Sequence, residues 1–126
     1  MKKKLAIGIL SVSLLIPISA SAARVAYYGY VLPTLSGNNY TGYHTKGTGD
    51  DYIFHELDAL QGAPQGANFW ADSSGSISQK YNQKVGSDTR INFNGDYSKG
   101  NDVRMGMENR EYWSTKGYAS GWVDFR

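Results

Sequence analysis

Apolar and polar side chains alternate with a period of two along four segments in the second half of the chain. In residues 119–125, Val123 and Phe125 point to one side while Trp122 points to the other. Because neighbouring side chains of a strand point to opposite faces of a sheet, this period predicts a strand. The same alternation recurs in residues 103–108, 90–93 and 68–72. We expect one common interior for the apolar side chains Val103, Met105, Met107, Ile91, Phe93, Val123 and Phe125.

Clusters of Gly, Asn, Asp and Ser separate these segments and predict the turns between them. Asn94-Gly95 is the strongest of these signals, because both residues tolerate the positive φ that a tight hairpin needs. We therefore expect residues 89–94 and 102–108 to be neighbouring antiparallel strands, joined by a loop longer than two residues. Short strands at this regular spacing are typical of a β-sandwich.

The N-terminal half carries weaker signals. Residues 24–32 are rich in tyrosine and valine and end before Pro33, which suits a first strand. A short strand is expected near Tyr40 and Tyr43. Residues 51–60 are ambiguous, because their apolar side chains fit a helical spacing as well as the alternation of a strand. We interpret them as a strand.

The composition after Ala22 supports an all-β fold. All ten tyrosines, three tryptophans and four phenylalanines lie there, together with fourteen of the fifteen glycines. Aromatic side chains suit a pleated, half-buried surface, and glycine suits turns. The chain has no cysteine, so its core must supply the stability that disulfides give many small secreted domains.

The first 22 residues have the pattern of a secretory signal peptide. Residues 2–4 are lysines, an apolar run spans residues 5–18, and Ala20 and Ala22 form the cleavage site. The run of fourteen residues is shorter than the roughly 20 that a membrane-spanning helix needs, which disfavours the alternative of an uncleaved anchor. We therefore expect cleavage after Ala22, a secreted, extracellular domain of residues 23–126, and no transmembrane anchor after cleavage.

Cleavage also changes the charge of the protein. The whole chain carries a formal net charge of +2, but the part after Ala22 has ten basic and eleven acidic side chains, a net charge of −1. Nucleic acids and acidic membrane surfaces attract clustered positive charge, so both are disfavoured as partners. The remaining 104 residues are enough for one domain.

Five short sequence motifs stand out after residue 67. They are Asn68-Phe69-Trp70, Tyr81-Asn82-Gln83-Lys84, Tyr97-Ser98-Lys99-Gly100, Val103 to Asn109, and Ser120 to Arg126. Together they resemble a group of small secreted proteins of uncharacterised function from Gram-positive bacilli. These motifs are typical of strands and turns and none is a catalytic signature, so the resemblance implies origin and fold rather than an activity. In size, signal peptide, lack of cysteine and Tyr/Gly/Asn-rich composition, the chain is more distantly similar to the lactococcin 972-type bacteriocins.

Residue types needed for catalysis or metal binding do not converge in the sequence. A zinc site needs three or four ligands, whereas the only histidines are His44 and His55, and Glu56 would face away from His55 on a strand. The loop holding Asp96, Asn101 and Asp102 offers oxygen ligands for calcium, but such residues more commonly stabilise turns. We therefore expect no catalytic residue, no metal site and no cofactor, and interpret the protein as a non-enzyme.

Two tryptophans are the strongest candidates for a binding surface. Both fall on the polar side of strands whose other side is apolar, and aromatic rings beside amide and carboxylate groups suit contacts with sugars or proteins. The expected site comprises Trp70 and Trp122 for stacking, with Asn68, Asp72 and Asp124 to orient the ligand. The alternative is that residues 27–30 cover both tryptophans and make them part of the core.

These observations predict an all-β, single-domain, antiparallel β-sandwich that follows a cleaved signal peptide. Its expected role is that of a secreted, non-catalytic binding module for a cell-envelope glycan or a surface protein. Two alternatives stay open, a secreted bacteriocin-like antibacterial protein and a small extracellular hydrolase. A binder would present exposed aromatic side chains, a toxin would inhibit neighbouring strains, and a hydrolase would have a cleft with acids of shifted pKa.

Overall fold

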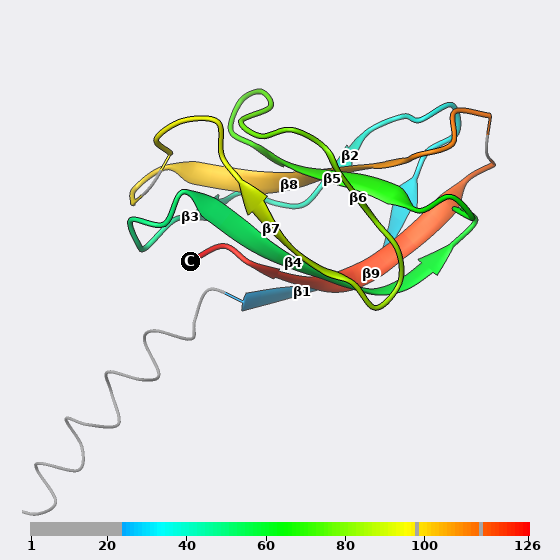
Figure 1. The fold of residues 1–126 in the computed structure, drawn as a ribbon, viewed down its shortest axis with the longest axis horizontal. Coiled ribbons are helices and arrows are strands. Elements are labelled where there is room, and N and C mark those ends of the chain that lie inside the picture. Colours follow the sequence, from blue (N-terminus) through cyan, green and yellow to red (C-terminus); the bar gives the residue numbers. More distant parts are fainter. Residues whose placement is uncertain (1–23, 98, 114) are drawn as a thin grey trace, which may run out of the picture.

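Two antiparallel sheets pack face to face, which confirms the predicted β-sandwich (Figure 1). The computed structural model describes residues 24–97, 99–113 and 115–126, so the predicted signal peptide at residues 1–22 lies outside the described part of the chain. The described residues form nine strands and no helix. Every one of these strands lies within the predicted secreted form, residues 23–126.

The first sheet has the strand order β1-β9-β4-β7. Its strands are β1 (Arg24–Leu32), β9 (Gly117–Asp124), β4 (Tyr52–Gln61) and β7 (Asp88–Asn92). The ambiguous segment 51–60 is therefore a strand, as its alternation indicated. Ile53 and His55 point into the core, while Phe54 and Glu56 point outward.

The second sheet has the order β2-β8-β5-β6, and β3 also pairs with β8. Its strands are β2 (Asn39–Tyr40), β3 (His44–Thr45), β8 (Asp102–Asn109), β5 (Ala67–Asp72) and β6 (Tyr81–Gln83). β2 and β3 pair with successive parts of β8. The region around Tyr40 and Tyr43 thus supplies two short strands where the sequence predicted one.

One predicted pairing is wrong, because β7 and β8 do not form a hairpin. β7 pairs with β4 and β8 pairs with β5, so the connection of residues 93–101 crosses from one sheet to the other. Neither Asn94 nor Gly95 adopts the positive φ that the predicted tight turn requires. The backbone N–H of Asn94 instead donates to the carbonyl oxygen of Ile77 at 2.7 Å. The loop is held by a residue distant in the sequence rather than by its own turn.

The core lies between the sheets and contains the apolar side chains that the alternation assigned to it. Phe93 is partly buried and packs against the others. The remaining six are at most 2% exposed: Val103, Met105, Met107, Ile91, Val123 and Phe125. The predicted inward faces of these strands are therefore confirmed.

A buried lysine closes the end of the core where β9 finishes. The Nζ of Lys46 donates to the carbonyl oxygens of Tyr52, Phe125 and Arg126 at 3.1, 3.2 and 2.5 Å. Burial lowers the pKa of Lys46, although nearby acids oppose the shift. A buried ammonium group is tolerated only when its hydrogen bonds are made, so these three bonds tie the end of the chain to the loop after β3.

A chain of two buried hydrogen bonds crosses the core and joins the two sheets. The hydroxyl of Tyr27 lies 2.7 Å from Nε2 of His55, and Nδ1 of His55 lies 2.6 Å from Oε1 of Gln83. Because a carbonyl oxygen only accepts, Nδ1 carries the proton, and the Tyr27 hydroxyl donates to Nε2. Burial lowers the pKa of His55 to about 4, although the bond to Gln83 opposes the shift. The imidazole is therefore neutral at neutral pH.

Candidate ligand-binding site

The five predicted binding residues separate onto the two outer faces of the sandwich. Asn68, Trp70 and Asp72 belong to β5 in the five-stranded sheet, whereas Trp122 and Asp124 belong to β9 in the four-stranded sheet. Because the core lies between the sheets, these residues do not form one surface. The prediction of a single shared site is wrong on this point, since alternation identifies a side of a strand but not the sheet that the strand joins.

Trp70 is buried on the outer face of its sheet and is not available for stacking. It is 2% exposed, and its ring lies so close to the backbone of Gly106 that a Cβ there would overlap the indole. Tyr40 meets the ring edge to face with centroids 6.0 Å apart, and Nζ of Lys80 lies 4.9 Å from the ring centroid. The alternative of burial is therefore correct for Trp70, but residues 27–30 are not its cover, because they belong to β1 in the other sheet.

Asn68 and Asp72 bind other side chains of this layer. The amide of Asn68 donates to Oε2 of Glu108 at 2.8 Å, and Lys80 binds the other oxygen of Glu108 at 2.8 Å. Nε of Arg104 donates to Oδ1 of Asp72 at 2.8 Å. These bonds fix the side chains that enclose Trp70. Asn68 and Asp72 therefore have a structural role in place of contact with a ligand.

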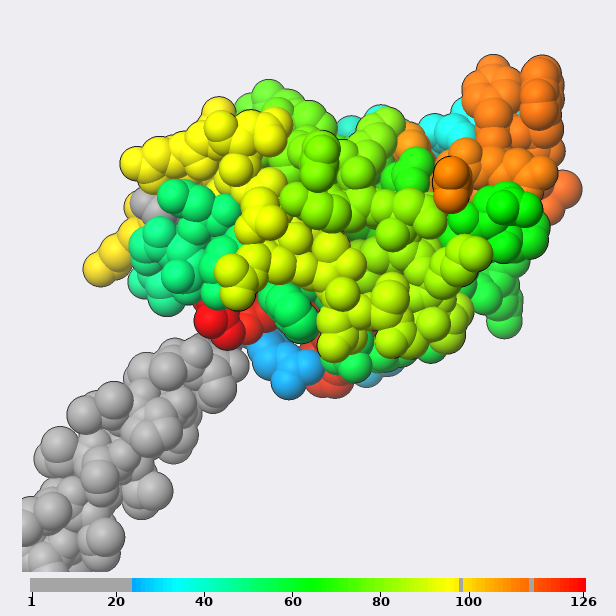
Figure 2. All heavy atoms as spheres, viewed as in Figure 1, coloured from blue at the N-terminus to red at the C-terminus, as the bar shows by residue number. Residues whose placement is uncertain are grey.

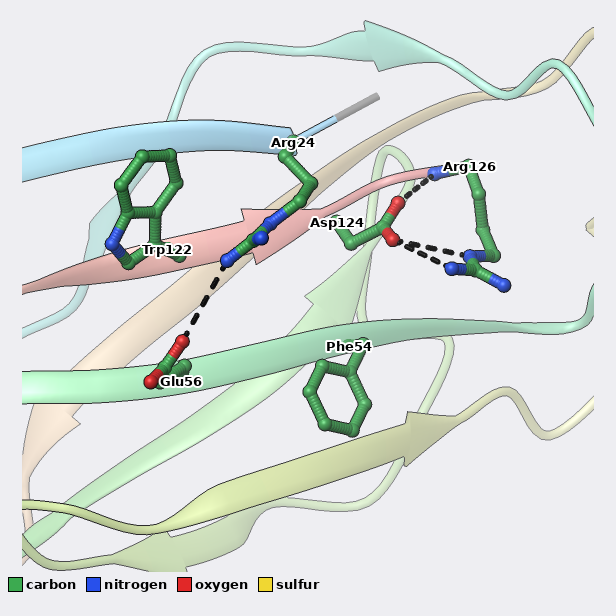
Figure 3. Close-up of a pocket in the computed structure, with 6 residues that line it drawn as sticks. All are labelled: Arg24, Phe54, Glu56, Trp122, Asp124 and Arg126. Carbon is green, nitrogen blue, oxygen red and sulfur yellow. Dashed lines mark hydrogen bonds and ion pairs between the residues drawn. The ribbon is translucent and has the colours of Figure 1, made fainter. Parts of the chain in front are cut away.

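The outer face of the four-stranded sheet is hollowed beside the other tryptophan. The hollow measures about 300 Å³, at the lower end of the range for small-ligand pockets. Alternate residues of three adjacent strands point into it, as Figure 3 shows. Its lining comprises Arg24, Phe54, Glu56, Trp122, Asp124 and Arg126.

Trp122 supplies the aromatic surface of this hollow. The residue is 37% exposed, and the guanidinium of Arg24 lies over its ring, 4.8 Å from the centroid. Arg24 reaches on from β1 to Glu56 on β4, with 3.7 Å between Nη2 and Oε2 (Figure 3). Ion pairs between such exposed side chains contribute little to stability. A ligand can therefore displace Arg24 and uncover the ring at small cost.

Asp124 and Arg126 form the second ion pair of the hollow. Nη2 and Nε of Arg126 donate to Oδ2 of Asp124 at 2.8 and 3.2 Å, and its backbone N–H donates to Oδ1 at 3.0 Å. Desolvation opposes ionisation of Asp124, but these bonds hold its pKa below the ordinary value. With Arg24 and Glu56, the lining has two cations and two anions. It offers donors and acceptors without net charge.

A second hollow, of about 320 Å³, lies further along the same face. Both neighbours of β9 bulge at this level, β1 around Gly29 and β4 between Leu57 and Ala59. Gly29 has a φ of +59° and its N–H donates to Oγ of Ser120 at 2.9 Å. This left-handed conformation favours glycine, and bulges redirect side chains beside functional sites. The second hollow is lined by Gly29, Ala59, Leu60, Gln61, Tyr118 and Ser120.

Both hollows hold an exposed aromatic side chain of β9. Tyr118 lines the second hollow and Trp122 the first, and both point outward. They are four residues apart, which corresponds to roughly 13 Å along a strand. The outer face of β9 thus presents two aromatic side chains in a line, each beside a hollow.

The sequence patterns did not predict Phe54, Glu56, Arg24 and Arg126 as members of the site. Phe54 and Glu56 lie on the outward side of the segment 51–60, and the strand alternation of that segment is the signal that places them there. Their position beside Trp122 depends on the pairing of β4 with β9, which places Phe54 opposite Asp124 and Glu56 opposite Trp122. No local pattern in the chain signals that pairing.

No protein-family model matches this chain, and no curated protein matches it either. Within the described residues, no group of three or more His, Cys, Asp or Glu side chains is placed to hold a metal ion. The same residues include no helix with the length and apolar character needed to cross a membrane.

Proposed function

We propose that this protein is a secreted, non-catalytic module that binds a cell-envelope glycan on the outer face of its four-stranded sheet. The observation that carries the proposal is the half-exposed ring of Trp122 in a hollow whose charges cancel. A sugar presents an apolar face of C–H groups and a rim of hydroxyls that both donate and accept hydrogen bonds. The indole suits the apolar face, and the arginines and carboxylates suit the rim.

The line of aromatic side chains along β9 favours a polymer over a single sugar. Tyr118 and Trp122 are separated by roughly 13 Å, farther apart than one sugar ring spans. A glycan chain lying along β9 would contact both rings and both hollows. Ser120 lies between the two aromatic residues, and its hydroxyl accepts the N–H of Gly29, so the strand surface between the rings is also polar.

The ion pairs favour binding over hydrolysis. A glycosidase needs one carboxyl group with a raised pKa to act as the acid. In this hollow the pKa of Asp124 is lowered and Glu56 is paired with Arg24. Carboxylates held in this way accept hydrogen bonds from hydroxyls but are poorly suited to donate a proton to a leaving group.

Co-sedimentation with purified Gram-positive cell walls tests the proposal. We expect residues 23–126 to bind the walls, and Trp122→Ala to weaken binding by about tenfold or more, because it removes the stacking surface. Trp113→Ala is the matched control, since Trp113 is an exposed tryptophan outside the hollow. Walls stripped of their secondary polymers distinguish peptidoglycan from those polymers as the ligand. Absence of binding to either preparation, or equal binding by Trp122→Ala, would contradict the proposal.

A further inference from the structure

The loop between β8 and β9 projects from the body of the sandwich, as the orange atoms in Figure 2 show. Trp113 in this loop is 81% exposed, and the neighbouring Tyr112 is exposed as well. Their rings meet edge to face with centroids 4.8 Å apart. Large aromatic side chains are usually mostly buried, so a tryptophan and a tyrosine packed on each other in solvent need an explanation.

A further exposed apolar side chain lies at the same end of the molecule. The loop of residues 33–38 runs beside the end of β8 (Figure 1), where Oγ of Ser36 donates to the carbonyl oxygen of Asn109 at 2.9 Å. Leu35 in this loop is exposed and has a φ of +57°. The left-handed conformation is unfavourable for a residue with a Cβ, and such strain is concentrated at functional segments.

Basic residues stand at both ends of the projecting loop. Arg110 and Lys116 are exposed, and Glu111 is the one acidic residue among residues 110–116. This loop therefore carries a net charge of +1, whereas the predicted secreted form carries −1. Positive charge therefore lies on both sides of the exposed aromatic side chains of this loop.

We propose that this tip, defined as Leu35, Arg110, Tyr112, Trp113 and Lys116, docks the protein on the surface of a lipid bilayer. Trp and Tyr side chains favour the headgroup level of a bilayer, where an apolar ring and a polar edge are both satisfied. Arginine and lysine beside them attract lipid phosphates. A projecting tip suits insertion between headgroups.

Docking through the tip does not require the proposed glycan-binding face. β9 begins at Gly117 beside the tip and ends at Asp124 in the first hollow. A protein docked through the tip would keep the far end of the four-stranded sheet away from the bilayer. The net charge of −1 opposes adsorption of the whole domain, so the aromatic side chains must carry the binding.

Sedimentation with vesicles tests the proposal on residues 23–126, because the apolar run at residues 5–18 would itself bind lipid. The vesicles are phosphatidylcholine alone, or phosphatidylcholine with an equal amount of phosphatidylglycerol. We expect binding to both, with preference for the anionic mixture. Trp113→Ala should weaken both by about tenfold or more, because a large aromatic surface no longer leaves water. Trp122→Ala is the matched control and should bind as the native protein does.

The charges are tested separately with the pair Arg110→Gln and Lys116→Gln, which should remove the preference for phosphatidylglycerol but retain binding to phosphatidylcholine. Trp113 is so exposed that its replacement should leave the melting temperature unchanged, which confirms that the variant is folded. Absence of vesicle binding, or equal binding by Trp113→Ala, would overturn the proposal. A native dimer that Trp113→Ala converts to a monomer, without lipid binding, would also overturn it and assign the tip to a protein contact.

Discussion

Acidification from about pH 7.5 to about pH 5 should destabilise the sandwich by about 2 kcal/mol through His55. The unfolded histidine has a pKa of about 6.5, whereas burial lowers the pKa in the fold to about 4. At a pH between these two pKa values, His55 is protonated in the unfolded state but neutral in the folded state. Acid therefore favours unfolding. The stabilisation is complete above pH 6.5, is lost as the pH falls towards 4, and changes no further below that. Each pKa unit corresponds to about 1.4 kcal/mol, which gives the stated magnitude at pH 5.

Urea unfolding at a series of pH values, for the native protein and His55→Gln, measures this contribution. The comparison is needed because burial also lowers the pKa of the second histidine, His44. Glutamine does not titrate. Between about pH 7.5 and pH 5, the free energy of unfolding of His55→Gln should therefore rise by about 2 kcal/mol relative to that of the native protein. Parallel pH profiles of the two proteins would show that His55 does not contribute to the pH dependence of stability. The histidine signals of the native protein in an NMR titration give an independent check, with His55 remaining neutral until close to pH 4.

Three further predictions concern the fold and the processing of the chain. Trp70→Ala should lower the free energy of unfolding by about 3–5 kcal/mol, because Trp70 is buried over Gly106; a loss as small as that of an exposed residue in urea unfolding would show that the cover is loose. Phe125→Ala should cost a similar amount, about 3–5 kcal/mol, since Phe125 is in the core, and a change below about 1 kcal/mol would mean that β9 faces the other way. If the protein is exported and cleaved as expected, the form recovered from the culture medium should start at Ala23 in N-terminal sequencing, and an intact Met1 on a membrane-bound form would contradict cleavage.

The sequence was sufficient to predict the strands and their inward faces, because alternation is a local property of the chain. Val123 and Phe125 point inward for the same reason that their neighbours point outward. The pairing of the strands depends on distant residues, and there the prediction failed. Asn94-Gly95 has the composition of a hairpin turn, but the hydrogen bond of Asn94 to Ile77 holds this loop in a crossing between sheets.

Trp70 and Trp122 show the same limit within the candidate site. Each lies on the polar side of an alternating strand, so the sequence treats them alike. Trp70 is buried because residues of other strands, among them Tyr40 and Lys80, close over it. Trp122 is covered by the exposed side chain of Arg24, which belongs to the edge strand β1. The difference between a structural and an available tryptophan thus arises from sheet order.

The most direct test of the proposed binding face is an NMR titration with soluble fragments of cell-wall glycan. The three tryptophans give three indole N–H signals, one from each environment: buried Trp70, half-exposed Trp122 and the projecting Trp113. We expect the Trp122 signal and the backbone amides of β9 around Tyr118 to shift on titration, while the Trp70 and Trp113 signals stay in place. Shifts confined to Trp113, or no shift at Trp122 at saturating glycan, would contradict this expectation.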